Sequence, residues 1–449
     1  MDMIERDAAR APVRRDFIPA DRYTGPDVAA RERRHLWPRI WHIACREEEI
    51  PNPGDYITYE ILDDSIIVVR TPECGIRAHY NVCQHRGRRL LPPGRGHVRG
   101  FVCGFHGWKY ALDGACTYVH REQEWADTAG FSRQAVSLAG VRAETWGGWV
   151  WINMDEAAPA LTDWLGDVVP IMENFDLPAM RRAWHEVLIA PVNWKVVVEA
   201  FAEGYHSGAT HGHWVDYNCS SAPATVRGNH AMFNVQFHEM PKVRLDDGTW
   251  ERARSTRDLI YYQCKELHRT LHALVTDPLM RAAEALRNEV ADDATDEQTY
   301  AKFWELQKRE VIATGAVWPE KLTPLDLFRA GINWHIFPNT IFLPAIDGIL
   351  WYRMRPHPDS AGKCIFDIWC LRRFPPGSDP TVETHVSDGF AAARGRNAFL
   401  EQDFGNMRSV EAGMNSRGWR GARVNPSEEA AIAHFHAMLD KYCFADVVG

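Results

Sequence analysis

The sequence has no apolar run of about 18 residues, the length that a helix needs to cross a membrane, so it predicts no membrane span. It has no block of basic residues either, and its net charge of −9 argues against nucleic acid as a partner. Acidic residues interrupt the arginines near the N-terminus, and no apolar segment follows them. A signal or transit peptide is therefore not expected, and the sequence indicates a cytoplasmic protein.

A disulfide framework is also missing. The ten cysteines are scattered over 449 residues, and we expect most of them to be small buried side chains in a reducing compartment. No Gly-x-Gly-x-x-Gly motif opens a βαβ unit, so a flavin or nicotinamide is expected to bind another protein. Apolar residues make up 45% of the chain and charged residues 25%, as in ordinary globular proteins, and the length allows two or three domains.

Two short motifs each combine one cysteine with one histidine. One residue separates Cys83 from His85, and two residues separate Cys103 from His106. Two cysteines and two histidines are the ligands of a Rieske [2Fe–2S] cluster, in which two histidines replace two cysteines on one iron. The same side chains could hold a tetrahedral zinc ion. Zinc sites usually pair Cys with Cys and His with His, so the alternation favours the iron–sulfur cluster.

A second constellation lies between Asn193 and His211. Glu199, Glu203 and His206 are spaced i, i+4, i+7, which would place them on one face of a helix. A Ser-Gly pair follows, where the helix could end and bring a second imidazole, His211, back to the first. Two imidazoles and one carboxylate form the facial triad of non-haem Fe(II) oxygenases, which leaves positions open for O2 and substrate. A buried helix with satisfied polar groups is the alternative.

Together the motifs resemble those of Rieske-type non-haem iron oxygenases, specifically the alpha (catalytic) subunit of ring-hydroxylating oxygenases. The first two are Cys-Gln-His-Arg-Gly-Arg-Arg-Leu at 83–90 and Cys-Gly-Phe-His-Gly-Trp-Lys-Tyr at 103–110. The third is Asn-Trp-Lys followed by Glu-x3-Glu-x2-His-x4-His at 193–211. The resemblance covers nearly the whole chain.

The resemblance implies an α+β fold with two domains. An all-β Rieske [2Fe–2S] domain would span 41–156. A larger catalytic domain would span 157–449, with helices covering an antiparallel sheet in a helix-grip-like arrangement and a helical insertion at about 255–315. Residues 1–40 would be an N-terminal arm and helix that pack on the catalytic domain.

The resemblance also implies one [2Fe–2S] Rieske cluster and one mononuclear Fe(II) per chain. The cluster ligands would be Cys83, His85, Cys103 and His106. Asp403 matches the family's distal aspartate and would hold the mononuclear iron together with His206 and His211. His213 could replace His211, but the x4 spacing favours His211.

In the family, electrons from NAD(P)H arrive through a separate reductase or ferredoxin and cross from the cluster of one subunit to the iron of its neighbour. The acidic residue that bridges the two sites corresponds to Glu203. Many aromatic dioxygenases have Asp at this position, whereas Glu-x3-Glu-x2-His resembles the homotrimeric choline, betaine and carnitine oxygenases. We therefore expect a homotrimer.

The expected reaction is the hydroxylation or dihydroxylation of an aromatic or other cyclic substrate with O2, as in aromatic hydrocarbon catabolism, because the apolar neighbours of the iron motif suit a ring. Candidate pocket residues are Phe201, Ala202, Trp214 and Asn339. Two alternatives remain open. One is demethylation or hydroxylation of a quaternary ammonium or methylated substrate, which would need an aromatic cage. The other is a Rieske electron carrier without oxygenase activity.

Overall fold

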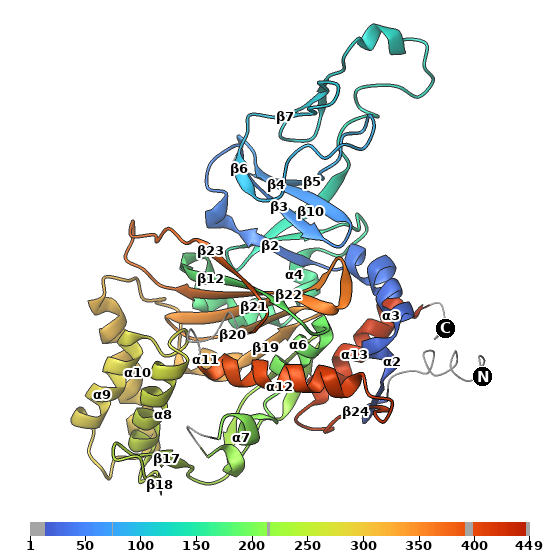
Figure 1. Cartoon of the computed structure of the whole chain (residues 1–449). Helices are drawn as coiled ribbons and strands as arrows, with labels where there is room; N and C mark the ends of the chain where they lie inside the picture. Colours follow the sequence, from blue (N-terminus) through green and yellow to red (C-terminus); the bar gives the residue numbers. More distant parts are fainter. Residues whose placement is uncertain (1–13, 74, 213–215, 391–397, 446–449) are drawn as a thin grey trace. The chain divides into compact units, whose positions relative to one another are not determined.

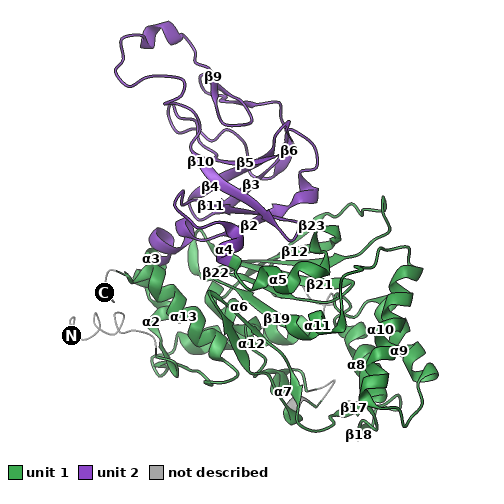
Figure 2. Ribbon diagram, turned by 180° about the vertical axis from the view of Figure 1, so that it is seen from behind, with its two compact units in different colours: residues 1–31, 165–449 green, residues 32–164 purple. Residues whose placement is uncertain are grey.

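A computed structural model of the protein describes residues 14–73, 75–212, 216–390 and 398–445 (Figure 1). The chain forms two compact units (Figure 2). The smaller unit is residues 32–164, and the larger unit is residues 1–31 with 165–449. The smaller unit extends beyond the expected 41–156 domain at both ends, and the expected N-terminal segment is divided between the two units. No helix among the described residues is long and apolar enough to span a membrane.

The smaller unit is built on an antiparallel sheet of seven strands in the order β2-β11-β10-β5-β4-β3-β6. Its strands are β2 (His42–Arg46), β3 (Asp55–Ile61), β4 (Asp64–Arg70), β5 (Ile76–Tyr80), β6 (Arg95–His97), β10 (Gly140–Trp146) and β11 (Trp149–Asn153). A second sheet contains β7 (Phe101–Val102), β8 (Lys109–Tyr110) and β9 (Cys116–Tyr118). The two Cys/His motifs lie in the loop that follows β5 and in the turn between β7 and β8, so the smaller unit is built on β-sheets, as expected, with both motifs in its loops.

The larger unit contains an eight-stranded sheet in the order β14-β15-β19-β20-β21-β22-β12-β23. Its strands are β12 (Arg181–Ala190), β14 (Ala224–Arg227), β15 (His230–Phe233), β19 (Asn333–Ile336), β20 (Thr340–Leu343), β21 (Gly348–His357), β22 (Ser360–Arg372) and β23 (Thr384–Asp388). All neighbouring strands are antiparallel except the last pair, in which β23 runs parallel to β12. The predicted antiparallel sheet is thus present, with one parallel edge strand.

Three helices cover this sheet: α6 (Trp194–Phe201), α12 (Ala398–Met414) and α13 (Ala430–Cys443). Helix α6 contacts β21 and β22, α12 contacts α6, and α13 contacts β14 and β15. Aromatic rings fill the first of these contacts, because the ring centroid of Phe201 lies 4.9 Å from that of Tyr352 and 5.6 Å from that of Phe366. Helices α6 and α12 therefore present side chains to one another above the sheet.

The region expected to be a helical insertion contains α8 (Thr256–Thr270), α9 (Asp277–Glu289) and α10 (Asp296–Ala313). Each helix has a Ser or Thr N-cap whose side chain accepts a backbone N–H in the first turn. The three pack around a common apolar core that contains Ile260, Cys264 and Leu286. Helix α8 contributes Ile260 and Cys264 to this core, so its apolar face packs inside the group of helices.

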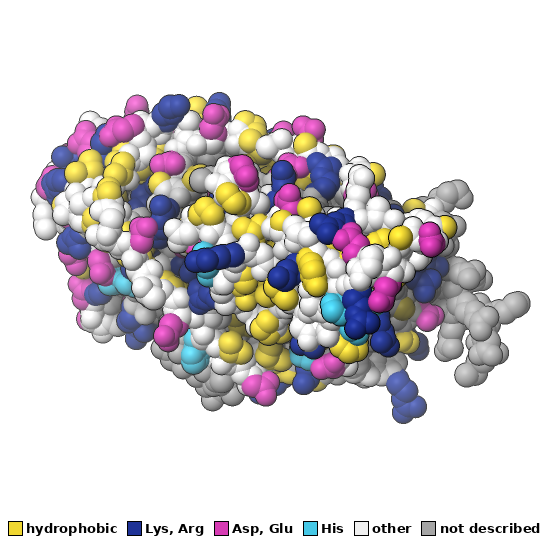
Figure 3. All heavy atoms as spheres, turned by 90° about the horizontal axis from the view of Figure 1, so that it is seen from above, with side chains coloured by type: hydrophobic (Ala, Val, Ile, Leu, Met, Phe, Trp, Pro, Cys, Tyr) yellow, Lys and Arg dark blue, Asp and Glu magenta, His cyan; other side chains and the backbone are white. Residues whose placement is uncertain are grey.

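The remaining elements are short. In the larger unit they are α2 (Asp21–Thr24), α3 (Pro26–Arg31), α5 (Val168–Met172), α7 (Ser207–Thr210), α11 (Pro324–Ala330), β13 (Ser220–Ser221), β16 (Gln236–Phe237), β17 (Lys242–Arg244) and β18 (Trp250–Arg252). Helix α4 (Leu161–Leu165) lies where the two units meet in the chain, and β1 (Phe17–Pro19) pairs with β24 (Gly421–Arg423). On the face drawn in Figure 3, Lys and Arg side chains lie among Asp and Glu side chains, so neither sign of charge dominates it.

A buried charge network joins three strands of the larger sheet. Asp367 on β22 accepts hydrogen bonds from Arg353 Nε at 3.0 Å, from Arg355 Nη2 at 3.1 Å and from His185 Nε2 at 3.1 Å. Burial alone would raise the pKa of Asp367, but the two guanidinium groups and the imidazole lower it far below its usual range. The carboxylate is therefore ionised and is the common partner of all three groups.

We expect Asp367→Ala to lower the free energy of unfolding by about 3–5 kcal/mol, because it leaves the buried guanidinium of Arg353 and the half-buried guanidinium of Arg355 without their carboxylate. Thermal or denaturant unfolding of the purified protein measures this change. The control is Asp359→Ala in the β21–β22 turn, where the side chain is 88% exposed, and we expect a change within about 0.5 kcal/mol. Equal stability of the two variants would contradict the structural role of the network.

Candidate metal centres

The two Cys/His loops of the smaller unit share one backbone pattern. The amide of each cysteine donates to the carbonyl five residues later, at 2.9 Å for Cys83 and 2.8 Å for Cys103. The amide of a glycine donates back to the cysteine carbonyl, at 3.0 Å for Gly87 and 2.9 Å for Gly107. Both glycines have a φ of 73°, a conformation that other residues adopt only with strain. The sequence therefore folds both loops into the same closed turn.

The four predicted ligand side chains come together in these loops. Cys83 and Cys103 are buried, each 2% exposed. The rings of His85 and His106 are half-buried, with centroids 4.6 Å apart, and the Nδ1 atom of each is buried without a hydrogen-bond partner. Buried polar atoms in native structures nearly always have a partner. Two thiols and two unpartnered imidazole nitrogens fit the ligand set of a Rieske cluster.

Electrostatics favour a thiolate at the second loop. Burial raises the pKa of Cys103, but hydrogen bonds from the Phe105 amide, the Cys83 thiol and the His106 amide, together with the charge of Arg88, outweigh burial, and the net shift is downward. These groups would stabilise the anionic sulfur that a cluster requires. They also place hydrogen-bond donors close to the sulfur, where they influence the reduction potential.

Aromatic side chains support the first loop. His85 stacks on Trp108, with ring centroids 4.8 Å apart and an angle of 8° between the planes. The hydroxyl of Tyr110 lies 3.3 Å from Cys83 Sγ and accepts a hydrogen bond from the amide of Gln84 at 3.2 Å. Since its lone pair is engaged by the amide, the hydroxyl proton is available to the sulfur.

We expect Tyr110→Phe to lower the reduction potential of the cluster, because a hydrogen bond to sulfur stabilises the reduced, more negative state. A hydrogen bond of about 0.5–1.5 kcal/mol corresponds to roughly 20–60 mV for a one-electron couple. Spectroelectrochemical titration measures the shift. Tyr118→Phe is the control, because this tyrosine is 40% exposed on the neighbouring strand β9. The reduction potential of the cluster in this variant should equal the wild-type value.

In the larger unit, Asn193 is the N-cap of α6, and its side chain accepts a hydrogen bond from the amide of Lys195 at 2.9 Å. The helix ends at Phe201, so the predicted helical face that includes Glu203 and His206 is wrong. The Glu203 carboxylate accepts a hydrogen bond from the amide of His206 at 3.1 Å. This bond replaces the hydrogen bond that the amide would make to a backbone carbonyl if the helix continued. The two residues lie in a turn between α6 and α7.

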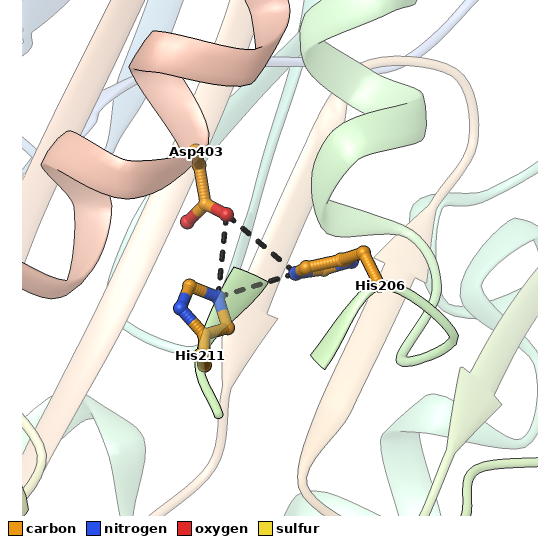
Figure 4. A group of neighbouring side chains, drawn as sticks. All are labelled: His206, His211 and Asp403. Carbon is orange, nitrogen blue, oxygen red and sulfur yellow. Dashed lines mark hydrogen bonds and ion pairs between the residues drawn. The ribbon is translucent and has the colours of Figure 1, made fainter. Parts of the chain in front are cut away.

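His206, His211 and Asp403 nevertheless converge, as Figure 4 shows. The Nε2 atoms of the two imidazoles are 3.3 Å apart. Asp403 Oδ1, from α12, lies 3.6 Å from Nε2 of His206 and 3.2 Å from Nε2 of His211. His211 is 1% exposed and Asp403 is 4% exposed, whereas His206 is half-buried. The predicted triad thus forms one compact group of candidate ligand atoms.

The second nitrogen of each imidazole has an acceptor as its partner. His206 Nδ1 lies 2.7 Å from Glu203 Oε1, and His211 Nδ1 lies 2.9 Å from Gln402 Oε1. Because both partners are oxygen acceptors, each Nδ1 carries the proton, and both Nε2 atoms present lone pairs to the centre. Asp403 Oδ2 is also buried without a hydrogen-bond partner. Three lone-pair atoms so close together repel one another unless a cation lies between them, so this site fits a divalent metal ion.

Gln402 had no part in the sequence-based prediction, and its position immediately before Asp403 is the only local indication of its contact. We expect Gln402→Leu to weaken iron binding at the triad by about 10–100-fold, because the His211 ring loses the partner that fixes its tautomer. Anaerobic iron titration of the protein with its cluster intact measures this. Gln402→Glu keeps an acceptor oxygen and should retain most of the affinity; a loss in both variants would contradict the assigned role.

A cavity of about 120 Å³ adjoins the triad. Aliphatic side chains and four aromatic rings dominate its lining, and the rings belong to Phe201, Phe233, Tyr352 and Phe399. Of the predicted pocket residues, Phe201 lines the cavity. Ala202 and Asn339 are buried but line neither this cavity nor the one described next, and Trp214 and His213 lie outside the described residues.

A larger cavity of about 480 Å³ adjoins the triad between α6, α12 and the start of α13. Four carboxylates line it, those of Asp403 from the triad and of Glu199, Glu203 and Glu429. Glu199 accepts hydrogen bonds from Tyr23 at 3.0 Å and from His436 at 2.6 Å. Burial and the two neighbouring carboxylates raise the pKa of Glu429. This cavity therefore has an acidic lining and includes the residue predicted to bridge the two metal centres.

Another group of possible ligands lies between α8 and α9, where His268 and His272 approach Asp277 at 2.8 and 2.9 Å. Arg372 Nη2 donates to His272 Nδ1 at 2.9 Å, so the proton of this imidazole is on Nε2, the atom that faces the carboxylate. A proton on that atom blocks a metal ion. The arrangement is a hydrogen-bonded link between two helices, and it holds the pKa of Asp277 at about 2.

Two family models match this chain. Residues 177–445 match the family model for the ring hydroxylating alpha subunit (catalytic domain). Residues 40–131 match the model for the Rieske [2Fe–2S] domain.

Curated relatives share about a third of the aligned residues. The carnitine monooxygenase oxygenase subunit of Escherichia coli (strain K12) is 33% identical over 197 residues, 43% of this chain and 52% of the relative. The glycine betaine monooxygenase oxygenase subunit of Chromohalobacter salexigens is 31% identical over 194 residues, 43% of each chain. The large oxygenase component of the naphthalene 1,2-dioxygenase system of Pseudomonas aeruginosa is 35% identical over 194 residues, 41% of this chain and 42% of the relative. The matches span about half the length of these relatives.

Solved structures share the fold over almost the whole chain. A quaternary ammonium Rieske monooxygenase in complex with L-carnitine has a TM-score of 0.62 and 20% identity, covering 96% of both chains. Another structure of this type, described in terms of carnitine oxidation and inter-subunit electron transfer, has a TM-score of 0.61 and 20% identity, covering 95% of both chains. Naphthalene 1,2-dioxygenase with indole bound has a TM-score of 0.62 and 18% identity, covering 96% of this chain and 94% of the other.

Proposed function

Because the chain belongs to the alpha subunits of the Rieske non-haem iron ring-hydroxylating oxygenases, we propose that it is the oxygenase component of a multicomponent system that uses O2 to oxidise a small organic substrate. Membership of this family confirms the predicted fold and enzyme class, together with the predicted cofactors, a Rieske [2Fe–2S] cluster and a mononuclear iron. The substrate, the redox partner and the assembly are proposals.

One observation carries the proposal: both Nε2 atoms and Asp403 Oδ1 present lone pairs to a common point beside a cavity. Bound there, Fe(II) would supply the O2 chemistry that side chains alone lack. The chain's own part is to hold the ligands. Glu203 and Gln402 keep the Nδ1 protons in place, and the apolar cavity excludes water from the reacting group.

We propose that electrons enter the cluster from a separate NAD(P)H-dependent reductase or ferredoxin and cross between copies of this chain in a homotrimer. Glu203 supports this route, because its carboxylate holds the iron-ligand imidazole of His206 and also lines the acidic cavity. Arg86 and Arg88 are exposed on the first cluster loop, and Phe105 on the second is 54% exposed. Their charge and apolar surface complement that acidic cavity on another copy.

For the substrate, we favour a methylated amine or quaternary ammonium compound over the aromatic hydrocarbon of the first prediction. Two of the relatives described above are named for carnitine and glycine betaine. The cavity supports this class, because its four aromatic rings can surround a cation and no Lys or Arg is among the described residues that line it. Hydroxylation of an aromatic ring is the second candidate, supported by the aliphatic part of the lining and by the naphthalene dioxygenase relative.

We expect Asp403→Ala to keep the cluster spectrum, to lose the mononuclear iron and to abolish product formation with a reductase, NADH and O2. Iron analysis should fall from about three to about two per chain, because the cluster retains its own two irons. Glu401→Gln, two residues away on α12, is the control and should keep both the iron and the activity. Unchanged turnover in Asp403→Ala would exclude the triad as the reaction site and favour an electron carrier.

A further inference from the structure

One polar side chain in the cavity beside the triad has an unpaired acceptor. Asn333, at the start of β19, lines this cavity and is 5% exposed, and its Oδ1 is buried without a hydrogen-bond partner. Among the described residues that line the cavity, Asp403 is the only other one with a buried, unpartnered side-chain atom, and it is a candidate metal ligand. An unpaired side-chain carbonyl is energetically unfavourable in a mostly apolar cavity unless a hydrogen-bond donor binds to it.

The orientation of the Asn333 amide is determined by its neighbour. Its Nδ2 donates to the backbone carbonyl of Phe201 at 3.0 Å, and a carbonyl only accepts hydrogen bonds. The atom that contacts Phe201 must therefore be the nitrogen, and the unpaired atom must be the oxygen. This bond also fixes the side chain to the end of α6, the segment that leads into Glu203 and His206. Asn333 is thus a pre-oriented acceptor on a rigid strand.

We propose that Asn333 is a specificity-determining residue whose Oδ1 accepts a hydrogen bond from the substrate. The inference rests on the proposed function and narrows its substrate class. The substrate must carry an N–H or O–H donor beside the group that is oxidised. A protonated tertiary methylamine or a ring with an N–H meets this requirement, whereas a compound without any donor leaves the carbonyl unpaired. The aromatic rings around the cavity surround the methyl groups or the ring, and the amide sets their orientation.

Matched probes with and without the donor test this directly. The first pair is benzyldimethylamine, which carries an N–H when protonated at neutral pH, and benzyltrimethylammonium, which has none. The second pair is indole and 1-methylindole. Binding to the anaerobic, iron-loaded holoenzyme is measured by calorimetry or by thermal shift. We expect the donor-bearing member of at least one pair to bind about 5- to 100-fold more tightly than its methylated partner.

Asn333→Leu should remove this preference, whereas a purely structural role would weaken both members of a pair equally. The matched control is Asn339→Leu, because Asn339 is also buried in the β19–β20 hairpin and donates to the carbonyl of Met354 at 2.9 Å, away from the cavity. The control should keep the wild-type ratio. The ratio of the two affinities in the wild-type protein is by itself enough to test the proposal. A variant that fails to fold therefore leaves this test unaffected.

The proposal is overturned if both members of each pair bind equally to the wild-type protein, or if neither donor-bearing probe binds. The measurements distinguish failure of this proposal from failure of the proposed function. If the protein oxidises the methylated probes as readily as the donor-bearing ones, the oxygenase function stands and the proposed role of Asn333 is wrong. A protein that binds the donor-bearing probe selectively but never oxidises it, with its iron and a competent reductase present, keeps the role of Asn333 and contradicts the oxygenase proposal.

Discussion

The candidate metal site of the larger unit depends on two hydrogen bonds that direct the imidazole protons away from its centre. Glu203 and Gln402 each accept from the Nδ1 of one imidazole, and both Nε2 lone pairs therefore face Asp403. If either partner were a donor, the imidazole would present a proton to the centre and could not bind iron. The turn after α6 and the inward face of α12 are the two structural features that supply these acceptors.

The sheet beneath the helices supports the candidate metal site indirectly, by fixing the helices next to it through packing. Phe201 packs on Tyr352 and Phe366, which fixes the end of α6 on β21 and β22. Phe404 on α12 also contacts Phe366, so both ligand-bearing segments share one aromatic support. The carboxylate of Asp367, one residue along β22, joins strands below them through three hydrogen bonds. The candidate metal ligands are therefore held by elements that are themselves fixed by packing.

Much of the site follows from the sequence, because the ligands of each centre are close together in the chain or match a family motif. The assignments of individual ligands stay predictions, and the structure brings the residues together as those assignments require. The position of His206 outside α6 could not be predicted from spacing, since its amide bonds to the Glu203 side chain instead of to a backbone carbonyl. Asn333 was missed because its neighbour Phe201 lies 132 residues away in the chain.

The shared backbone pattern of the two cluster loops has a further consequence. Each loop is closed by a reciprocal pair of bonds between its cysteine and the residues that follow, and its glycine conformation suits this turn. Loops closed in this way would hold the four candidate ligand side chains in place when a bound cluster gains or loses an electron. Little movement of the ligands would then accompany each change of charge.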